Sequence, residues 1–222
     1  MKKLLSFLIA VSMVLCCFGI TAVAEESLSA TVYVSISDKG ELVVVQEAVT
    51  VTDIDEDGML TVNDALFAAH EAKFTGGANA GYNYYTGDYG LSMGMLWGDT
   101  SGCYGYYLNN ASCWSLADPI KNGDSINAFV YSDANAWSDM YCWFDTTSVE
   151  ANIGDTVTLT LSGAGYDADW NPIALPVANA VITINGEATE FITDDQGNVS
   201  FTVENAGEYI ISATSDAQIL VP

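Results

Sequence analysis

The chain has no arginine, and its basic side chains are five lysines and one histidine against 29 aspartates and glutamates in 222 residues. Nucleic-acid binding depends on clustered Lys and Arg that neutralise phosphates, so this composition excludes nucleic acid as a partner. Cations are better suited as partners of such a negatively charged chain. High negative charge also keeps a protein soluble outside the cell, which is the simpler interpretation of the same excess.

Long apolar runs are lacking after the first 24 residues. Lys2 and Lys3 precede an apolar run from residue 4 to residue 20, and Ala22-Val23-Ala24 has the small residues of a cleavage site. This pattern predicts a signal peptide at residues 1–24 and a protein that is secreted or lies at the cell surface. The remaining chain would keep three lysines and all 29 acids, a formal charge of 3 − 29 = −26. We expect no membrane span in it, because a span needs roughly 20 apolar residues.

Cysteine is scarce, and catalytic signatures are missing. Three cysteines follow the leader, Cys103, Cys113 and Cys142, with no CxxC spacing. Two of them can pair outside the cytoplasm, and the spacing leaves all three pairings open. His70 is the only histidine and has no nucleophile near it in sequence, and no phosphate loop or catalytic metal motif occurs. The sequence therefore predicts a protein that is not an enzyme.

The composition and the hydrophobic pattern of the chain change at about residue 146. Up to about residue 146 it is rich in Gly, Tyr and Trp: a hairpin pattern covers residues 31–45, a helix is expected at residues 62–74, and short aromatic strands follow. From residue 147 onward only alternating strands occur, with turns every 8 to 12 residues. We therefore expect an α+β domain at residues 25–146, followed by an all-β, Ig-like β-sandwich at residues 147–222.

Residues 53 to 64 read Asp-Ile-Asp-Glu-Asp-Gly-Met-Leu-Thr-Val-Asn-Asp, which is the spacing of a calcium loop that runs into a helix. Gly58 falls at the sharp turn. The expected oxygen ligands are Asp53, Asp55, Asp57, the Met59 carbonyl, Thr61 and Asp64. Asp64 stands where an EF-hand has glutamate, and dockerin-type loops do carry Asp there. The loop thus predicts a structural Ca²⁺ site.

An acidic turn before a capped helix is the alternative, with Thr61 as the N-cap and Asp64 completing a capping box. Both interpretations need Thr61 and Asp64, so these two residues do not discriminate. Asp53, Asp55 and Asp57 do, because three carboxylates within five residues are unfavourable without a counter-ion.

Aromatic side chains crowd the segment from residue 97 to residue 143. Exposed rings stack on sugars or planar ligands, whereas buried rings fill the core of a small domain. Most of these rings are expected in the core. Tyr106, Trp114 and Trp137 lie next to polar turn residues and are the best candidates for an exposed binding face.

Three segments together resemble the DUF4430 family: the loop and helix at residues 53–70, Gly105-Tyr-Tyr-Leu-Asn-Asn, and Pro119-Ile-Lys-Asn-Gly-Asp-Ser-Ile. That family is similar to the C-terminal domain of transcobalamin and intrinsic factor. The resemblance covers residues 30–145 and implies a β-grasp-like fold with a ligand-binding role, with Tyr106, Tyr107 and Asn109 as surface positions. Residues 193–201 and 206–209 are similar to bacterial Ig-like or carboxypeptidase-regulatory-like domains, which usually space or present other domains. We expect a small-molecule, glycan or protein ligand, and a structural or adhesion module is the alternative.

Overall fold

The structure, a computed structural model, describes residues 28–88 and 90–221. The expected signal peptide at residues 1–24 lies outside the described residues. As the sequence predicted in coarse terms, the protein is mostly β, with 48% strand and 8% helix. Within the described ranges, no helix is both long and apolar enough to cross a membrane.

The N-terminal region, residues 28–131, is built on a five-stranded sheet in the order β2-β1-β7-β5-β6. The predicted hairpin is present: β1 and β2 are antiparallel and join at Lys39 and Gly40, both with positive φ. β1 also pairs in parallel with β7, whereas β5 and β7 are antiparallel. The strand bounds are β1 Ser29–Asp38, β2 Glu41–Thr52, β5 Tyr104–Leu108, β6 Ala111–Ser112 and β7 Ser125–Val130.

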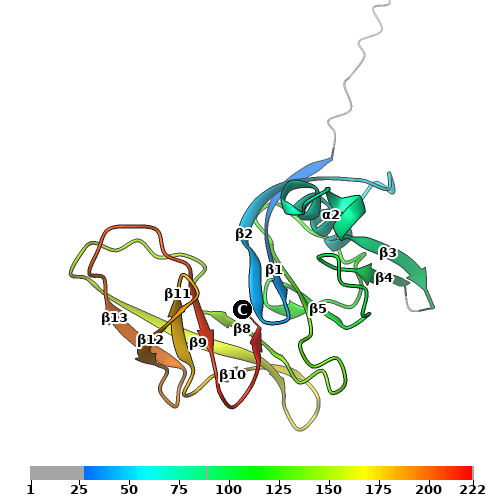
Figure 1. The fold of residues 1–222 in the computed structure, drawn as a ribbon. Coiled ribbons are helices and arrows are strands. Elements are labelled where there is room, and N and C mark those ends of the chain that lie inside the picture. Colours follow the sequence, from blue (N-terminus) through cyan, green and yellow to red (C-terminus); the bar gives the residue numbers. More distant parts are fainter. Residues whose placement is uncertain (1–27, 89, 222) are drawn as a thin grey trace, which may run out of the picture.

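Helix α2 (Val62–Lys73) lies over β2 and β1, as Figure 1 shows, and confirms the helix expected at residues 62–74. Its buried face, which includes Leu66 and Ala69, contributes to one apolar core together with Val32, Val34 and other inward residues of β1. The one-turn helix α3 (Ala78–Gly81) and the hairpin of β3 (Asn83–Gly87) and β4 (Gly90–Met95) follow α2. Met93 of β4 is also buried in this core.

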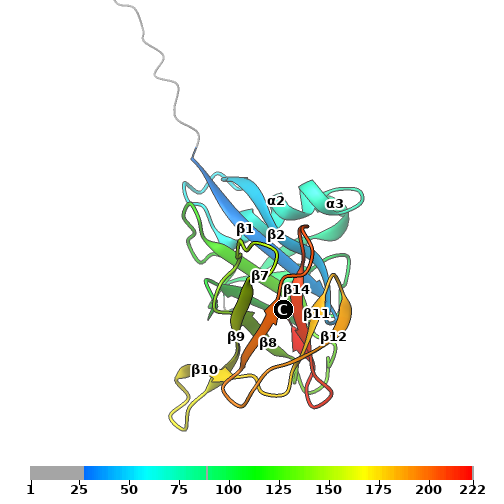
Figure 2. The same cartoon turned by 90° about the vertical axis from the view of Figure 1, so that its left-hand side faces the viewer.

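The C-terminal region, residues 140–221, contains two further sheets (Figure 2). One has the order β10-β9-β8-β15, with β13 also paired to β9, and the other has the order β12-β11-β14. Their inner residues, among them Leu159, Leu161 and Ile182, form a second apolar core. The strands are β8 Met140–Phe144, β9 Thr156–Tyr166, β10 Pro172–Pro176, β11 Val181–Ile184, β12 Glu187–Ile192, β13 Asn198–Thr202, β14 Ile211–Thr214 and β15 Leu220–Val221.

An aromatic stack joins the two regions. The Tyr107 ring of β5 lies 4.0 Å from the Tyr141 ring of β8, and Phe129 and Trp143 continue the stack on either side. Phe129 and Tyr141 are almost fully buried in this contact, together with Val221. The regions therefore share a small third core.

The break in strand pairing falls earlier than the boundary expected between residues 146 and 147. β8 was expected in the first domain, yet it pairs antiparallel with β9 and in parallel with β15. Segment 132–139 is therefore the connection between the sheets, and β8 belongs to the C-terminal region. The reason lies in distant pairing, since Leu220 and Val221 provide one of the two neighbours of β8.

Candidate functional site

The acidic loop between β2 and α2 folds around its first carboxylate. Asp53 accepts hydrogen bonds from the backbone N–H groups of Asp57 (3.2 Å) and Gly58 (2.8 Å). Gly58 has φ +87°, in the left-handed region that glycine adopts without strain. One carboxylate oxygen from each of Asp53, Asp55 and Asp57 lies within 4.8 Å of the others. Three of the six expected calcium ligands are thus brought together.

The electrostatics of these carboxylates differ. Hydrogen bonds from the loop, first that of the Gly58 N–H, hold the pKa of Asp53 below its ordinary value. Desolvation raises the pKa of Asp55, and the negative charges of Asp57, Asp64 and Asp53 add to it. The loop therefore disfavours the negative charge of Asp55, and a bound cation would relieve the repulsion.

The other expected ligands are engaged differently. Thr61 and Asp64 form the capping box: the Asp64 carboxylate accepts from the Thr61 backbone N–H (2.8 Å) and hydroxyl (2.7 Å), and Thr61 Oγ1 accepts from the Asp64 N–H. Asp64 also accepts from the Ile54 N–H at 3.0 Å. The Met59 N–H donates to Asp57. The capping alternative is therefore present, and it leaves the three clustered aspartates without a capping role on α2.

Two of the five ligand-binding candidates are tryptophans, and both are well exposed; Asn109 is exposed as well. Trp114 is 95% exposed and follows β6, and Trp137 is 61% exposed in the segment that connects the regions. The Trp137 indole N–H donates to the Ala134 carbonyl, and its ring stacks 6.1 Å from Tyr131. Trp137 has φ +54°, a left-handed conformation that is strained for a bulky residue.

The other three candidates support the fold. Tyr106 is half-buried against the N-terminal core, and Tyr107 is part of the aromatic stack. The Asn109 amide donates to the Asp124 carboxylate and accepts from the Ser125 N–H, both at 2.9 Å. Asn109 thereby ties the end of β5 to the turn before β7. The exposed aromatic surface of this region thus depends on Trp114 and Trp137.

His70 is fully buried on α2, and both of its ring nitrogens are engaged. Nδ1 lies 2.7 Å from the Leu66 carbonyl, and Nε2 accepts from the Trp97 backbone N–H at 3.1 Å. This arrangement requires the neutral ring with the proton on Nδ1. Burial lowers the pKa of His70 to about 4. A neutral, buried ring with no exposed nitrogen is poorly placed for proton transfer, and its contacts are structural.

The three cysteines are free thiols in the structure. The Cys113 N–H donates to the Tyr106 carbonyl, so Cys113 lies opposite Tyr106, whereas Cys103 precedes Tyr106 by three residues. That strand spacing separates the Cys103 and Cys113 backbones by roughly 10 Å, beyond the reach of a disulfide. Cys142 lies in the C-terminal core, away from the N-terminal core that Cys113 contacts. Burial raises the pKa of both Cys113 and Cys142 to about 12.

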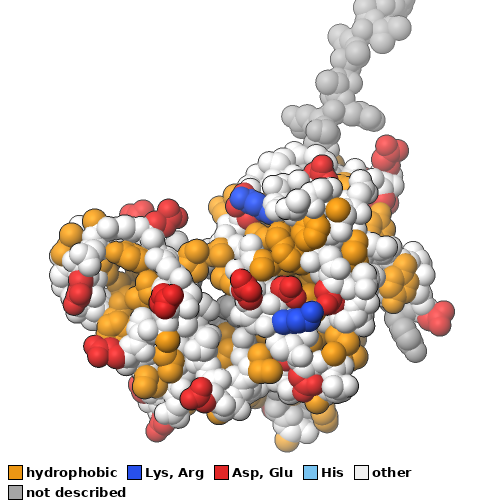
Figure 3. All heavy atoms as spheres, in the orientation of Figure 1, with side chains coloured by type: hydrophobic (Ala, Val, Ile, Leu, Met, Phe, Trp, Pro, Cys, Tyr) orange, Lys and Arg blue, Asp and Glu red, His pale blue; other side chains and the backbone are white. Residues whose placement is uncertain are grey.

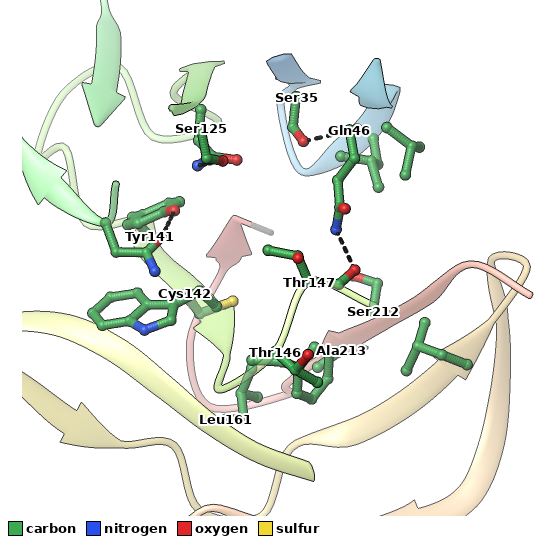
Figure 4. A pocket seen from close by; sticks show the side chains of 17 residues that line it. Ser35, Gln46, Ser125, Tyr141, Cys142, Thr146, Thr147, Leu161, Ser212 and Ala213 are labelled. Atoms are coloured by element: carbon green, nitrogen blue, oxygen red, sulfur yellow. Dashed lines mark hydrogen bonds between the residues drawn. The ribbon is translucent and has the colours of Figure 1, made fainter. Parts of the chain in front are cut away.

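Two surface features escaped the sequence reasoning. A cavity of about 110 Å³ lies where the two regions meet, lined from β1, β2, β7, β8 and β14 (Figure 4). Trp170, 80% exposed at the turn between β9 and β10, lies beside Tyr166. The cavity has no local signal, because its walls come from segments distant in sequence.

No family model, no curated protein and no solved structure matches this chain.

Proposed function

We propose that the protein is a non-enzymatic binding protein of the cell exterior, with a small molecule or glycan as its ligand. The observation that carries the proposal is the exposure of Trp114 and Trp137. A large apolar side chain gains about 1.5 to 3 kcal/mol from burial, and these two gain little of it from the fold. A ligand with a planar or sugar ring would supply the missing contact.

The topology supports the more specific fold assignment. The order β2-β1-β7-β5, the parallel pairing of β1 with β7 and the helix that follows the first hairpin suit a β-grasp-like domain, as the DUF4430 resemblance implies. The two packed sheets of the C-terminal region suit an Ig-like spacer. In this proposal the N-terminal region binds the ligand, and the C-terminal region is a spacer that presents the N-terminal region.

A structural Ca²⁺ ion is part of the proposal. Asp53, Asp55 and Asp57 would hold it, with the Met59 carbonyl at the next position of the loop. The ion would neutralise the carboxylate whose pKa is raised, Asp55, and would fix the connection between β2 and α2. Thr61 and Asp64 would serve chiefly as the helix cap that they already form.

Calcium is tested by titration calorimetry and thermal unfolding. Extracellular sites bind in the range of about 0.1 to 1 mM, so 10 mM Ca²⁺ should stabilise the protein by about 1.4 kcal/mol or more. Asp55→Asn should abolish the heat and the shift, whereas Asp195→Asn, an exposed acid in the turn between β12 and β13, should leave both intact. If the wild type gives no heat and melts identically with and without chelator, the calcium site is absent.

Ligand binding is tested by a thermal-shift screen of oligosaccharides, cobalamin and cobinamide. A saturable stabilisation is expected, and Trp114→Ala or Trp137→Ala should reduce it. Trp170→Ala is the matched control, since that indole is also exposed but belongs to the C-terminal region. A screen without any response would contradict the binding role.

A structural or adhesion module is the second candidate, favoured by the hairpin of β9 and β10. Tyr166, Trp170, Ile173 and Leu175 leave apolar surface exposed there. The Val177 N–H donates to β9, and alternation then points the backbone of residues 172, 174 and 176 outward. Because Pro172 and Pro176 have no N–H, strand addition is disfavoured, and a partner would contact the side chains.

A further inference from the structure

A cavity lies at the junction of the two regions, with walls from both. It has a volume of about 110 Å³. Figure 4 shows Ser35 and Gln46 on one side, Ser125 and Tyr141 on another, and Thr147 and Ser212 below them. Ligand sites occur preferentially where two domains meet, because each domain supplies one wall.

The lining is uncharged. The chain carries 29 acids, yet no Asp, Glu, Lys or His is among the 17 described residues that line this cavity. The absence of a cationic side chain disfavours phosphates and carboxylates, and the absence of a carboxylate disfavours cations. Nine of the 17 lining side chains carry a hydroxyl or amide group, which disfavours a hydrocarbon ligand. The ligand class that best fits this lining is therefore a neutral molecule with many hydrogen-bonding groups.

Several lining groups are already held in place. The Gln46 side-chain amide donates to the Thr147 carbonyl at 2.9 Å, and the Gln46 backbone N–H donates to Ser35 Oγ. The Tyr141 hydroxyl donates to the Asn110 side chain at 2.7 Å. Amides and hydroxyls have more donors and acceptors than one such bond uses. These contacts therefore orient polar groups before a ligand arrives, which lowers the entropic cost of binding.

An aromatic ring completes the lining. Trp143 is half-buried and stacks on Tyr141 with ring centroids 5.4 Å apart and planes 25° apart. Because Tyr141 is itself fixed against Tyr107, the indole is positioned by the stack that joins the two regions. A sugar ring has polar edges and apolar C–H faces, so hydroxyl and amide groups beside an indole match both.

The volume limits how much of a ligand the cavity can enclose. A water molecule takes about 30 Å³ of liquid volume, so the 110 Å³ of the cavity corresponds to about four water molecules, which is enough for part of one sugar ring while the rest of the ring stays outside. We propose that the junction cavity binds one neutral sugar residue, either free or at the end of a glycan. The proposal rests on the binding role argued above but not on the exposed indoles of Trp114 and Trp137.

Titration calorimetry with glucose, galactose, mannose and N-acetylglucosamine tests it, beside glucuronate and glucose phosphate as charged probes. At least one neutral sugar should bind with millimolar or tighter affinity, and the charged probes should bind at least tenfold more weakly. Ser212→Leu should weaken the binding at least tenfold, because Ser212 is one of the lining residues and a leucine there would fill space in the cavity.

Thr214→Leu is the matched control, since it also replaces a hydroxyl side chain with leucine, two residues further along β14 at an exposed position outside the cavity. Gln46→Ala is a second test at an exposed position that removes a hydrogen-bonding group without filling the cavity, and it should also weaken binding. Unaltered sugar binding by both Ser212→Leu and Gln46→Ala would overturn the cavity assignment, as would tighter binding of the charged probes. If Trp114→Ala abolishes binding and Ser212→Leu does not, the cavity assignment is wrong and the general binding role stands. If no neutral sugar binds, the cavity assignment is wrong. The general binding role is contradicted only if the thermal-shift screen also gives no response.

Discussion

The N-terminal and C-terminal regions bury different kinds of polar group. Asp64, His70 and Asp124 are all buried in the N-terminal region, and each holds a loop or turn by hydrogen bonds to backbone N–H or C=O groups. In the described C-terminal region the buried polar side chains are the hydroxyls of Thr183 and Thr193. Both regions have an apolar core and strand ladders, but in the described residues only the first also uses buried titratable groups to hold its loops and turns.

This difference has a functional consequence. Irregular segments lie around α2, and their backbone groups need side-chain partners where strands do not supply them. Carboxylates and an imidazole provide such partners, but they make the region sensitive to pH and to cations. The C-terminal region buries hydroxyls alone, and its loop carboxylates such as Asp194 are exposed at the surface, where Figure 3 shows acidic side chains. It should therefore respond less to pH and to cations than the N-terminal region, which suits a spacer.

The largest expected effect comes from separating the two regions. Tyr141→Ala removes a nearly fully buried ring from the shared aromatic stack and should cost about 3 to 5 kcal/mol. Calorimetry should then resolve two transitions where the wild type shows one. Leu161→Ala, in the C-terminal core alone, is the comparison, because it should lower stability without uncoupling the regions. A single sharp transition for Tyr141→Ala would show that the stack does not couple them.

The next effect concerns the buried carboxylate at the start of α2. Asp64→Ala removes the acceptor for the Ile54 and Thr61 N–H groups and should destabilise the N-terminal region by about 3 kcal/mol. Asp194→Ala is the matched change in the C-terminal region, where an exposed carboxylate accepts from the Gln196 and Asn198 N–H groups. Denaturant unfolding should show the smaller loss for Asp194→Ala. Equal losses would remove the distinction between buried and exposed loop carboxylates.

Acid should weaken the N-terminal region through His70. Its pKa is near 6.5 when unfolded and about 4 when folded, so the unfolded chain binds the proton more tightly. The stabilisation is complete above pH 6.5 and is lost as the pH falls toward 4, by about 2 to 3 kcal/mol. His70→Gln cannot titrate and should lack this component, so the stability difference between the two proteins should shrink as the pH falls from 7 to 4. A difference that stays constant would contradict the neutral ring.

Local signals predicted the features that depend on neighbouring residues. The turn at Lys39 and Gly40, the start of α2 at Val62 and the capping box of Thr61 with Asp64 all depend on contacts within a few residues. The same holds for the clustering of Asp53, Asp55 and Asp57, since one turn brings them together.

Local signals could not predict contacts between residues that are distant in sequence. Nothing near β8 indicates that Leu220 and Val221 pair with it, and this pairing moved the break between the regions. Tyr107 was expected at the surface, but it packs against Tyr141, 34 residues later in the chain. The junction cavity likewise has walls from segments distant in sequence, such as Ser35, Tyr141 and Ser212. A site between two domains is therefore the part of the molecule that periodicity and spacing reveal least.

The smallest expected effect compares two exposed indoles. Trp170 has φ +63° and contacts the ring of Tyr166 at 6.0 Å, so its left-handed backbone is strained with little packing in return. Trp170→Gly should leave the free energy of unfolding unchanged or raise it by less than about 1 kcal/mol, because glycine adopts this conformation freely. Trp114→Ala, at an exposed indole for which no positive φ occurs, should change stability by less than about 0.5 kcal/mol. A loss above about 1 kcal/mol for Trp170→Gly would mean that the indole packs on the hairpin of β9 and β10 in solution. The apolar surface that this hairpin offers to a partner would then be smaller than the exposed area of Trp170 indicates.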